Sequence, residues 1–246
     1  MNVHIFARCT PFVLMAFVLA GCATFGGGDA PLATGMVSKT IMVDGIERTY
    51  VVYVPPTYDA SDSWPLVMFL HGAGERGDDG VDQSTVGIGP AIEANPERFP
   101  CIVVMPQCPK NIMWTARYDE INGALDATLD EYNIDRSRMY LTGLSMGGYG
   151  TFMYGADNVD RFAAMAPICG GGRVTDAAKL ATVPMWVFHG DADPVVTPDK
   201  SRTMVEAIKA AGGDVRYTEY PGVGHNSWDN AYAEPELMTW MLSQTK

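Results

Sequence analysis

A serine set between glycines is the residue of this sequence best placed for chemistry. It lies in the pentapeptide Gly143-Leu144-Ser145-Met146-Gly147. Residues 139–142 predict a short buried strand before it, and the residues to about 158 predict a helix after it. A serine at the sharp turn between a strand and a helix is a nucleophile elbow, in which glycines leave room where the two elements nearly touch. The N–H groups at the start of the helix also favour negative charge beside the hydroxyl.

A hydroxyl nucleophile needs a base, and the base needs an orienting acid. Of the four histidines, only His225 lies in a glycine-bordered loop after the last expected strand. The acid is Asp193 or Asp191. We favour Asp193 because it lies further past its strand, beside a proline that can turn the loop back, whereas Asp191 is better placed for local backbone hydrogen bonds. The sequence therefore predicts the triad Ser145, Asp193 and His225, in that chain order.

Negative charge on a substrate oxygen also needs donors. We expect two backbone N–H groups to supply them, that of Met146, directly after the serine, and that of Ala73, in a glycine-rich loop after an earlier strand. His71 and His189 directly end expected strands, and we expect them to fix loops by hydrogen bonding. This chemistry calls for neither a cofactor nor a metal.

Two tryptophans and a glutamine follow in loops that could face the serine. Trp114 and Trp228 could form aromatic walls for a sugar ring or an aromatic acyl group, and Gln107 could also reach the pocket. The alternative is that both tryptophans anchor loops within the core.

Strands and helices alternate along the chain and so could position these residues. Apolar runs typical of buried strands occur at 66–70, 102–105, 139–142, 162–168, 185–189 and 215–220. Two β-rich runs flank Asp44-Gly45, which predicts a hairpin. Alternation of this kind predicts an α/β fold with a mostly parallel sheet of about eight strands between helical layers.

The N-terminal residues have a different composition. Residues 1–21 contain Arg8 and an apolar run, as in a bacterial secretion signal. The run ends in Leu19-Ala20-Gly21-Cys22, which resembles the lipobox of bacterial lipoproteins. That resemblance implies lipid attachment at Cys22 and a place in the bacterial cell envelope, at the outer membrane if the cell is Gram-negative. The run of three glycines at 26–28 and Pro31 predict a flexible tether over 22–35, and the change of pattern at Met36 predicts a catalytic domain over 36–246.

Charge and cysteine content narrow the possible partners. The net charge of −12 argues against nucleic acid as a partner. Past the lipobox, three cysteines remain, namely Cys101, Cys108 and Cys169. Cys101 and Cys108 flank one expected strand, so we predict buried free thiols in place of a disulfide framework.

Residues 36–246 resemble bacterial esterases of the α/β-hydrolase superfamily, in the group of feruloyl-esterase-like and polyhydroxybutyrate-depolymerase-like enzymes that also includes chains labelled predicted peptidases. The motifs that carry the resemblance are 70–77 (Leu-His-Gly-Ala-Gly-Glu-Arg-Gly), 143–150, 189–196 (His-Gly-Asp-Ala-Asp-Pro-Val-Val) and Gly224-His225 with Trp228. Depolymerase-like members often have a cysteine where this chain has Ala73, which weakens that reading.

The resemblance implies a serine carboxylic-ester hydrolase that works through an acyl-enzyme. The loops give the expected substrates, which are small-acyl or hydroxycinnamoyl esters, including carbohydrate-linked ones. The two long loops, around 75–90 and 106–118, are polar or aromatic and do not resemble a cover for long acyl tails. The alternatives are a serine peptidase of the prolyl-oligopeptidase-like type and a non-catalytic binding module on the same fold.

Overall fold

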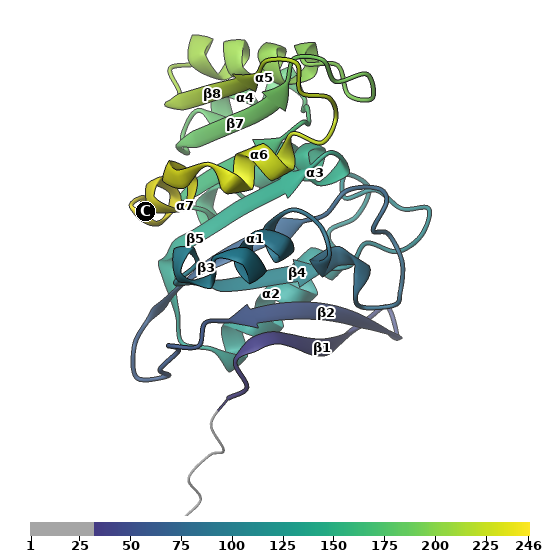
Figure 1. The fold of residues 1–246 in the computed structure, drawn as a ribbon, viewed down its shortest axis with the longest axis vertical. Coiled ribbons are helices and arrows are strands. Elements are labelled where there is room, and N and C mark those ends of the chain that lie inside the picture. The colour runs from purple at the N-terminus through teal and green to yellow at the C-terminus, as the bar shows by residue number, and fades with distance from the viewer. Residues whose placement is uncertain (1–31) are drawn as a thin grey trace, which may run out of the picture. The chain divides into compact units, whose positions relative to one another are not determined.

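The computed structural model describes residues 32–246, and an eight-stranded sheet runs through them (Figure 1). The strands are β1 (Gly35–Val43), β2 (Ile46–Val54), β3 (Trp64–Leu70), β4 (Ile102–Pro106), β5 (Ile134–Leu144), β6 (Ala164–Ile168), β7 (Met185–Gly190) and β8 (Val215–Tyr220). They are ordered β1-β2-β4-β3-β5-β6-β7-β8. β2 pairs antiparallel with β1 and with β4, and the remaining neighbours are parallel. This confirms the predicted α/β fold and the hairpin at Asp44-Gly45.

Helices cover both faces of the sheet. They are α1 (Ile88–Ala94), α2 (Asp119–Glu131), α3 (Met146–Asp157), α4 (Ala177–Leu180), α5 (Asp199–Ala210), α6 (Trp228–Ala233) and α7 (Pro235–Leu242), with short 3-10 turns at Asp82–Ser84, Pro96–Arg98, Val159–Arg161 and Val174–Asp176. The buried side chains of α2, α3, α4 and α5 join one core cluster, and those of α1, α6 and α7 join the other. The sheet therefore lies between two helical layers, and in Figure 1 α1, α6 and α7 lie on the side nearer the viewer.

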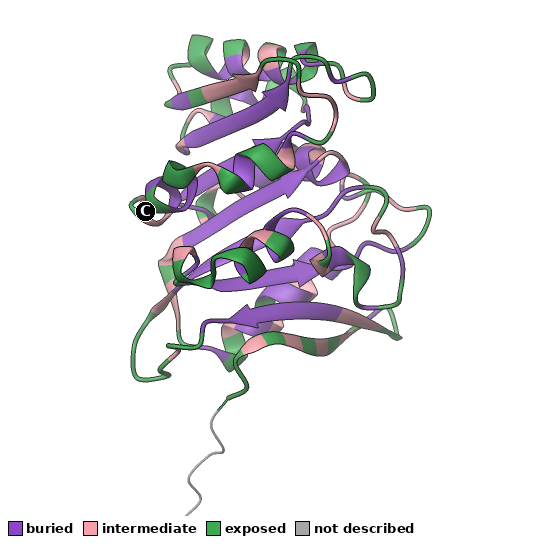
Figure 2. Cartoon of the chain, viewed as in Figure 1, coloured by how far each residue is buried: buried purple, intermediate pink, exposed green. Residues whose placement is uncertain are grey.

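The central strand β3 shows why the sheet needs both layers. Leu66, Met68 and Leu70 belong to one core cluster, whereas Val67 and Phe69 belong to the other. Successive side chains of a strand point to opposite faces, so a strand that is apolar throughout must be covered on both. The central strands are correspondingly buried, and the edge strand β1 alternates between partly buried and exposed residues (Figure 2).

The parallel strands determine where chemistry can gather. Strands β3, β5 and β7, and their parallel neighbour β8, all end at the same edge of the sheet, and each continues into a loop there. These loops carry His71, Ser145, Asp193 and His225 respectively. The carboxyl edge of a parallel sheet is the usual place for a binding site.

The predicted signal segment and the predicted lipidation at Cys22 lie outside the described residues, as does most of the tether. Among residues 32–246, no helix is both long enough and apolar enough to cross a membrane. Cys101, Cys108 and Cys169 are buried and unbonded, as the sequence predicted.

Candidate active site

Ser145 occupies a strained turn between β5 and α3. Its backbone has φ +52° and ψ −114°, a conformation that costs a non-glycine residue free energy and persists only where the surrounding structure enforces it. The neighbouring glycines make the turn possible. A Cβ on Gly147 would lie 1.8 Å from the carbonyl oxygen of Leu70, and a Cβ on Gly143 would lie 2.5 Å from the carbonyl oxygen of Gly147. The predicted elbow is therefore present, with the serine at its apex.

His225 joins Ser145 to Asp193. Its Nε2 atom lies 2.9 Å from Ser145 Oγ, and its Nδ1 atom lies 2.7 Å from Asp193 Oδ2. The structure thus brings together the three residues that the sequence selected from loops far apart in the chain. Asp191 is not hydrogen-bonded to His225. Its carboxylate accepts the N–H of Gly222 at 2.6 Å. This is the local backbone role that the sequence suggested for it.

The carboxylate of Asp193 is fully buried and well supplied with donors. Its Oδ1 atom accepts the N–H groups of Val195 at 2.8 Å and Val196 at 3.0 Å. Burial alone would raise the pKa of Asp193, but the hydrogen bonds from His225 and from these two N–H groups hold it below its ordinary value of 3.8. Asp193 therefore remains ionised at neutral pH and can orient the imidazole of His225.

The loop after β3 passes beside the serine. A Cβ on Gly72 would lie 3.7 Å from the Cβ of Ser145. His71 is buried, and burial lowers its pKa to about 4, so its ring is neutral at physiological pH. Its Nδ1–H donates to the carbonyl oxygen of Gly72 at 2.6 Å, and its Nε2 accepts the N–H of Cys108 at 2.9 Å.

These bonds set the direction of the next peptide group. The C=O and N–H of a trans peptide point in opposite directions, so the N–H of Ala73 is turned away from the His71 ring. Met146 is the first residue of α3, where backbone N–H groups have no partner within the helix. The two predicted donors thus come from the loop and the helix end that adjoin Ser145.

The prediction that Trp114 lines the pocket is wrong. Its side chain is only 1% exposed and belongs to the core. Its indole N–H donates to the carbonyl oxygen of His71 at 3.0 Å, and its ring meets that of His71 edge to face. Its Cβ lies 2.9 Å from where a Cβ on Gly150 would stand, so the tryptophan fills the space that this glycine leaves on α3. Trp114 braces the loop that holds Ala73.

The prediction for Gln107 is also wrong. This residue is buried, and its amide is used within the protein. Its Oε1 accepts the N–H of Gly80 at 2.8 Å, and its Nε2 donates to the carbonyl oxygen of Glu75 and to the carboxylate of Asp79. Gln107 fastens the 75–80 loop and has no free group to offer a substrate.

Trp228 does lie beside the candidate site. It is partly buried at the start of α6, and its ring stands edge to face with that of His225, with centroids 5.4 Å apart. Of the two tryptophans selected from the sequence, only Trp228 is placed to meet a ligand.

Cys169, which the sequence predicted only as a buried free thiol, is a neighbour of the triad. It follows β6 with φ +40°, and its sulfur lies within 4.8 Å of ligand atoms of Asp193 and His225. Burial raises the pKa of its thiol to about 12, so it is neutral at physiological pH. A thiol, a carboxylate and an imidazole can bind a metal, but here the Asp193 carboxylate and the His225 imidazole are hydrogen-bonded to each other. In the sequence, the three glycines at 170–172 indicated that the loop after β6 is closely packed.

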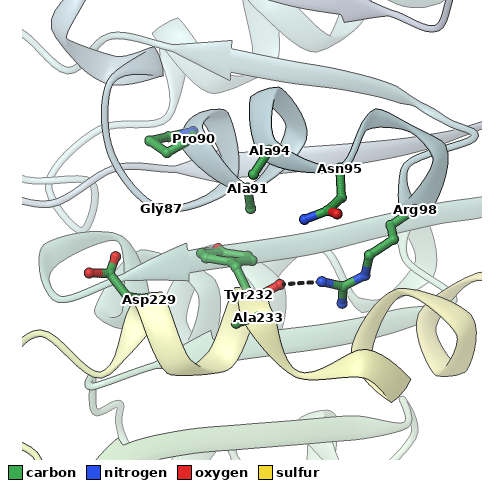
Figure 3. Close-up of a pocket in the computed structure, with 9 residues that line it drawn as sticks. All are labelled: Gly87, Pro90, Ala91, Ala94, Asn95, Arg98, Asp229, Tyr232 and Ala233. Atoms are coloured by element: carbon green, nitrogen blue, oxygen red, sulfur yellow. Dashed lines mark hydrogen bonds between the residues drawn. The ribbon is translucent and has the colours of Figure 1, made fainter.

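A groove between α1 and α6 is lined by residues outside the triad (Figure 3). At one end Gly87 packs against Leu144, the residue before the serine, and Asp229 follows Trp228. At the other end the Arg98 guanidinium donates to the carbonyl oxygens of Tyr232 and Glu234. The groove has a volume of about 320 Å³, and its lining combines small apolar side chains with Asn95, Arg98 and Asp229.

Comparison with known proteins agrees with this architecture. The model of the dienelactone hydrolase family matches residues 94–235, more than half of the chain. A bifunctional acetylxylan esterase/xylanase from Neocallimastix patriciarum is 32% identical over 186 residues, which are 72% of this chain and 26% of that protein. A probable feruloyl esterase C from Aspergillus flavus is 25% identical over 79% of this chain and 75% of its own length.

Solved structures give the same result. A thermostable esterase superposes with a TM-score of 0.79 at 38% identity, over 86% of this chain and 63% of its own. A mutant feruloyl esterase module from Clostridium thermocellum, complexed with sinapinate, shares the fold with a TM-score of 0.70 at 19% identity, over 87% and 90% of the two chains. The chain therefore belongs to the dienelactone hydrolase family and has the α/β-hydrolase fold of the esterases that it resembles.

Proposed function

We propose that this protein is a serine carboxylic-ester hydrolase that works through an acyl-enzyme. The observation that carries the proposal is the unbroken hydrogen-bonded line from Ser145 through His225 to the ionised Asp193. In this mechanism His225 Nε2 takes the proton of Ser145 Oγ as that oxygen attacks the ester carbonyl. His225 then gives the proton to the departing alcohol, and an activated water releases the acid.

The developing negative charge would fall on the carbonyl oxygen of the ester. In this proposal the backbone N–H groups of Ala73 and Met146 donate to it. Fixed donors aimed at a charge that appears only in the transition state lower the barrier, because they need no reorganisation during the reaction. His71 and Trp114 hold the loop that carries the Ala73 donor, through hydrogen bonds to the carbonyl oxygens of Gly72 and His71.

The proposed substrates are small-acyl or hydroxycinnamoyl esters, including those linked to carbohydrate. The relatives described as acetylxylan esterase and feruloyl esterase support this substrate class. Trp228 supports an aromatic or sugar group near His225.

The test is a substrate panel on the purified protein. We expect kcat/KM to be higher for acetyl and feruloyl esters than for a palmitoyl ester, and higher for esters than for matched amides. Ser145→Ala should abolish labelling by a fluorophosphonate and lower kcat by several powers of ten, because triad members act as a unit. Ser61→Ala, at an exposed serine, is the matched control and should retain both.

Other outcomes would redirect the proposal. A preference for amides over esters would favour the peptidase alternative. A protein that neither turns over esters nor reacts with the probe would be a binding module on a hydrolase fold.

A further inference from the structure

Asp193 has a second histidine partner that the proposed mechanism does not use. His189, the fifth residue of β7, is fully buried, and its Nε2 atom lies 3.2 Å from Asp193 Oδ2. The same Nε2 atom lies 2.8 Å from the carbonyl oxygen of Val196. A carbonyl oxygen can only accept, so Nε2 carries a hydrogen and shares it between that carbonyl and the carboxylate.

The other ring nitrogen is held from the opposite side. His189 Nδ1 lies 2.7 Å from the hydroxyl of Ser201, a buried residue of α5, and this hydroxyl lies 3.0 Å from the carbonyl oxygen of Gly170. The Ser201 hydroxyl donates its hydrogen to the Gly170 carbonyl oxygen and stays within hydrogen-bond distance of Nδ1, so the ring is held between β7 and α5. Ser201 therefore anchors the ring in the orientation that points Nε2 at Asp193.

The two oxygen atoms of the Asp193 carboxylate have different kinds of hydrogen-bond donor. On Oδ1, the N–H groups of Val195 and Val196 belong to the loop of Asp193 itself. On Oδ2, the donors are His225, which must change its charge during catalysis, and His189, which is buried and fixed. Without His189, the only remaining donor to Oδ2 would be His225, the group that the carboxylate has to orient, and the carbonyl oxygen of Val196 would lose the N–H of His189.

We propose that His189 is a positioning residue for the catalytic acid, holding the Asp193 carboxylate and the 193–196 loop at the distance and in the plane that His225 requires. This inference rests on the proposed serine mechanism. It predicts that what matters at position 189 is one hydrogen-bond donor at the place of Nε2.

The test compares three variants of the whole protein. His189→Gln places an amide N–H near the position of Nε2, His189→Leu fills the site without a donor, and His189→Asn keeps a polar side chain that is too short to reach Asp193. The readouts are kcat and KM for a small acetyl ester, the rate at which Ser145 reacts with a fluorophosphonate, and the urea unfolding midpoint.

We expect His189→Gln to stay within about threefold of the unmodified protein in kcat. His189→Leu should lower kcat and the labelling rate by about 10- to 100-fold, the range expected from one hydrogen bond to a charged group, with little change in KM. If the leucine variant does not fold, His189→Asn carries the same expectation. In an Asp193→Asn background, His189→Leu should cost much less, because the effect acts through the carboxylate.

Three results would overturn the inference. They are a leucine variant with undiminished kcat, a folded glutamine variant as impaired as the leucine variant, and an undiminished effect of His189→Leu in the Asp193→Asn background. A different result separates the underlying mechanism: if the unmodified protein does not react with the fluorophosphonate at Ser145, the serine-hydrolase proposal itself fails.

Discussion

Replacing Trp114 by phenylalanine tests whether this residue acts as a brace or as a substrate contact. Its indole N–H donates to the His71 carbonyl oxygen in a buried setting. Phenylalanine has no donor, and leaving that carbonyl unpaired should cost about 1–3 kcal/mol. The smaller ring also leaves a cavity, which should add about 1 kcal/mol. We therefore expect Trp114→Phe to lower the free energy of unfolding by about 2–4 kcal/mol and Tm by about 5–15 °C.

The expected effect on specificity is small. Trp114 supports the loop of Ala73 from within the core, so its loss should reduce kcat/KM by a similar factor for every ester. Trp228→Phe is the matched control, because Trp228 is only partly buried and lies against His225. That variant should change the ratio of kcat/KM for feruloyl and acetyl esters while shifting the free energy of unfolding by less than about 1 kcal/mol.

Urea unfolding and a two-ester kinetic assay decide between the two roles. The reasoning is refuted if Trp114→Phe unfolds at the same urea concentration as the unmodified protein yet selectively loses activity on the feruloyl ester. Trp114 would then contact the acyl group, and its burial would have to be relieved when substrate binds.

Three further predictions follow from single groups. Asp193→Asn should lower kcat by about 10⁴-fold, since an amide no longer selects the required tautomer of His225, whereas Asp191→Asn should cost far less; the reverse order of kcat values would exchange the two assignments. Burial raises the pKa of Glu75, so its ionised form destabilises the fold at pH 7. Glu75→Gln should therefore raise the free energy of unfolding at pH 7. This gain should vanish below about pH 4, where the carboxyl is protonated in folded and unfolded chains alike. An equal gain at pH 7 and below pH 4 would contradict the burial argument. On the proposal that Cys22 carries a lipid, Cys22→Ala should release the protein from membranes, and a natural protein found only in the soluble fraction would speak against the anchor.

The elbow was predictable from sequence because its determinants are local. Gly143, Ser145 and Gly147 lie within five residues, and each glycine is required by a nearby backbone atom, of α3 and β3 for Gly143 and of β3 for Gly147. His225 and Asp193 were predictable for a different reason. Parallel strands end at one edge of a sheet, so residues directly after strands meet there even when the chain separates them widely.

The pocket was not predictable, because a loop in the sequence does not reveal which way it folds. Trp114 and Gln107 follow β4 in a segment without helix or strand, and such segments usually lie at the surface. Here the segment turns back onto α3 and the loop after β3. The space for Trp114 is left by Gly150, a residue on another element. The partners of Gln107 are two backbone groups and the Asp79 carboxylate, about 30 residues away in the sequence. Neither partner can be inferred from the residues around the tryptophan or the glutamine.

His189 shows a related limit within a single motif. The sequence placed it at the end of a strand as a loop-fixing residue, and it does fix the loop through Val196. The contact of His189 with Asp193 could not be predicted from the motif. The direction in which the Asp193 carboxylate points depends on His225, Val195 and Val196 together. The acid of the triad is therefore held both by a residue of its own strand and by the base from the neighbouring strand's loop. A change at either histidine should reach Ser145 through the same carboxylate, which is why a double substitution with Asp193 is the measurement that separates their roles.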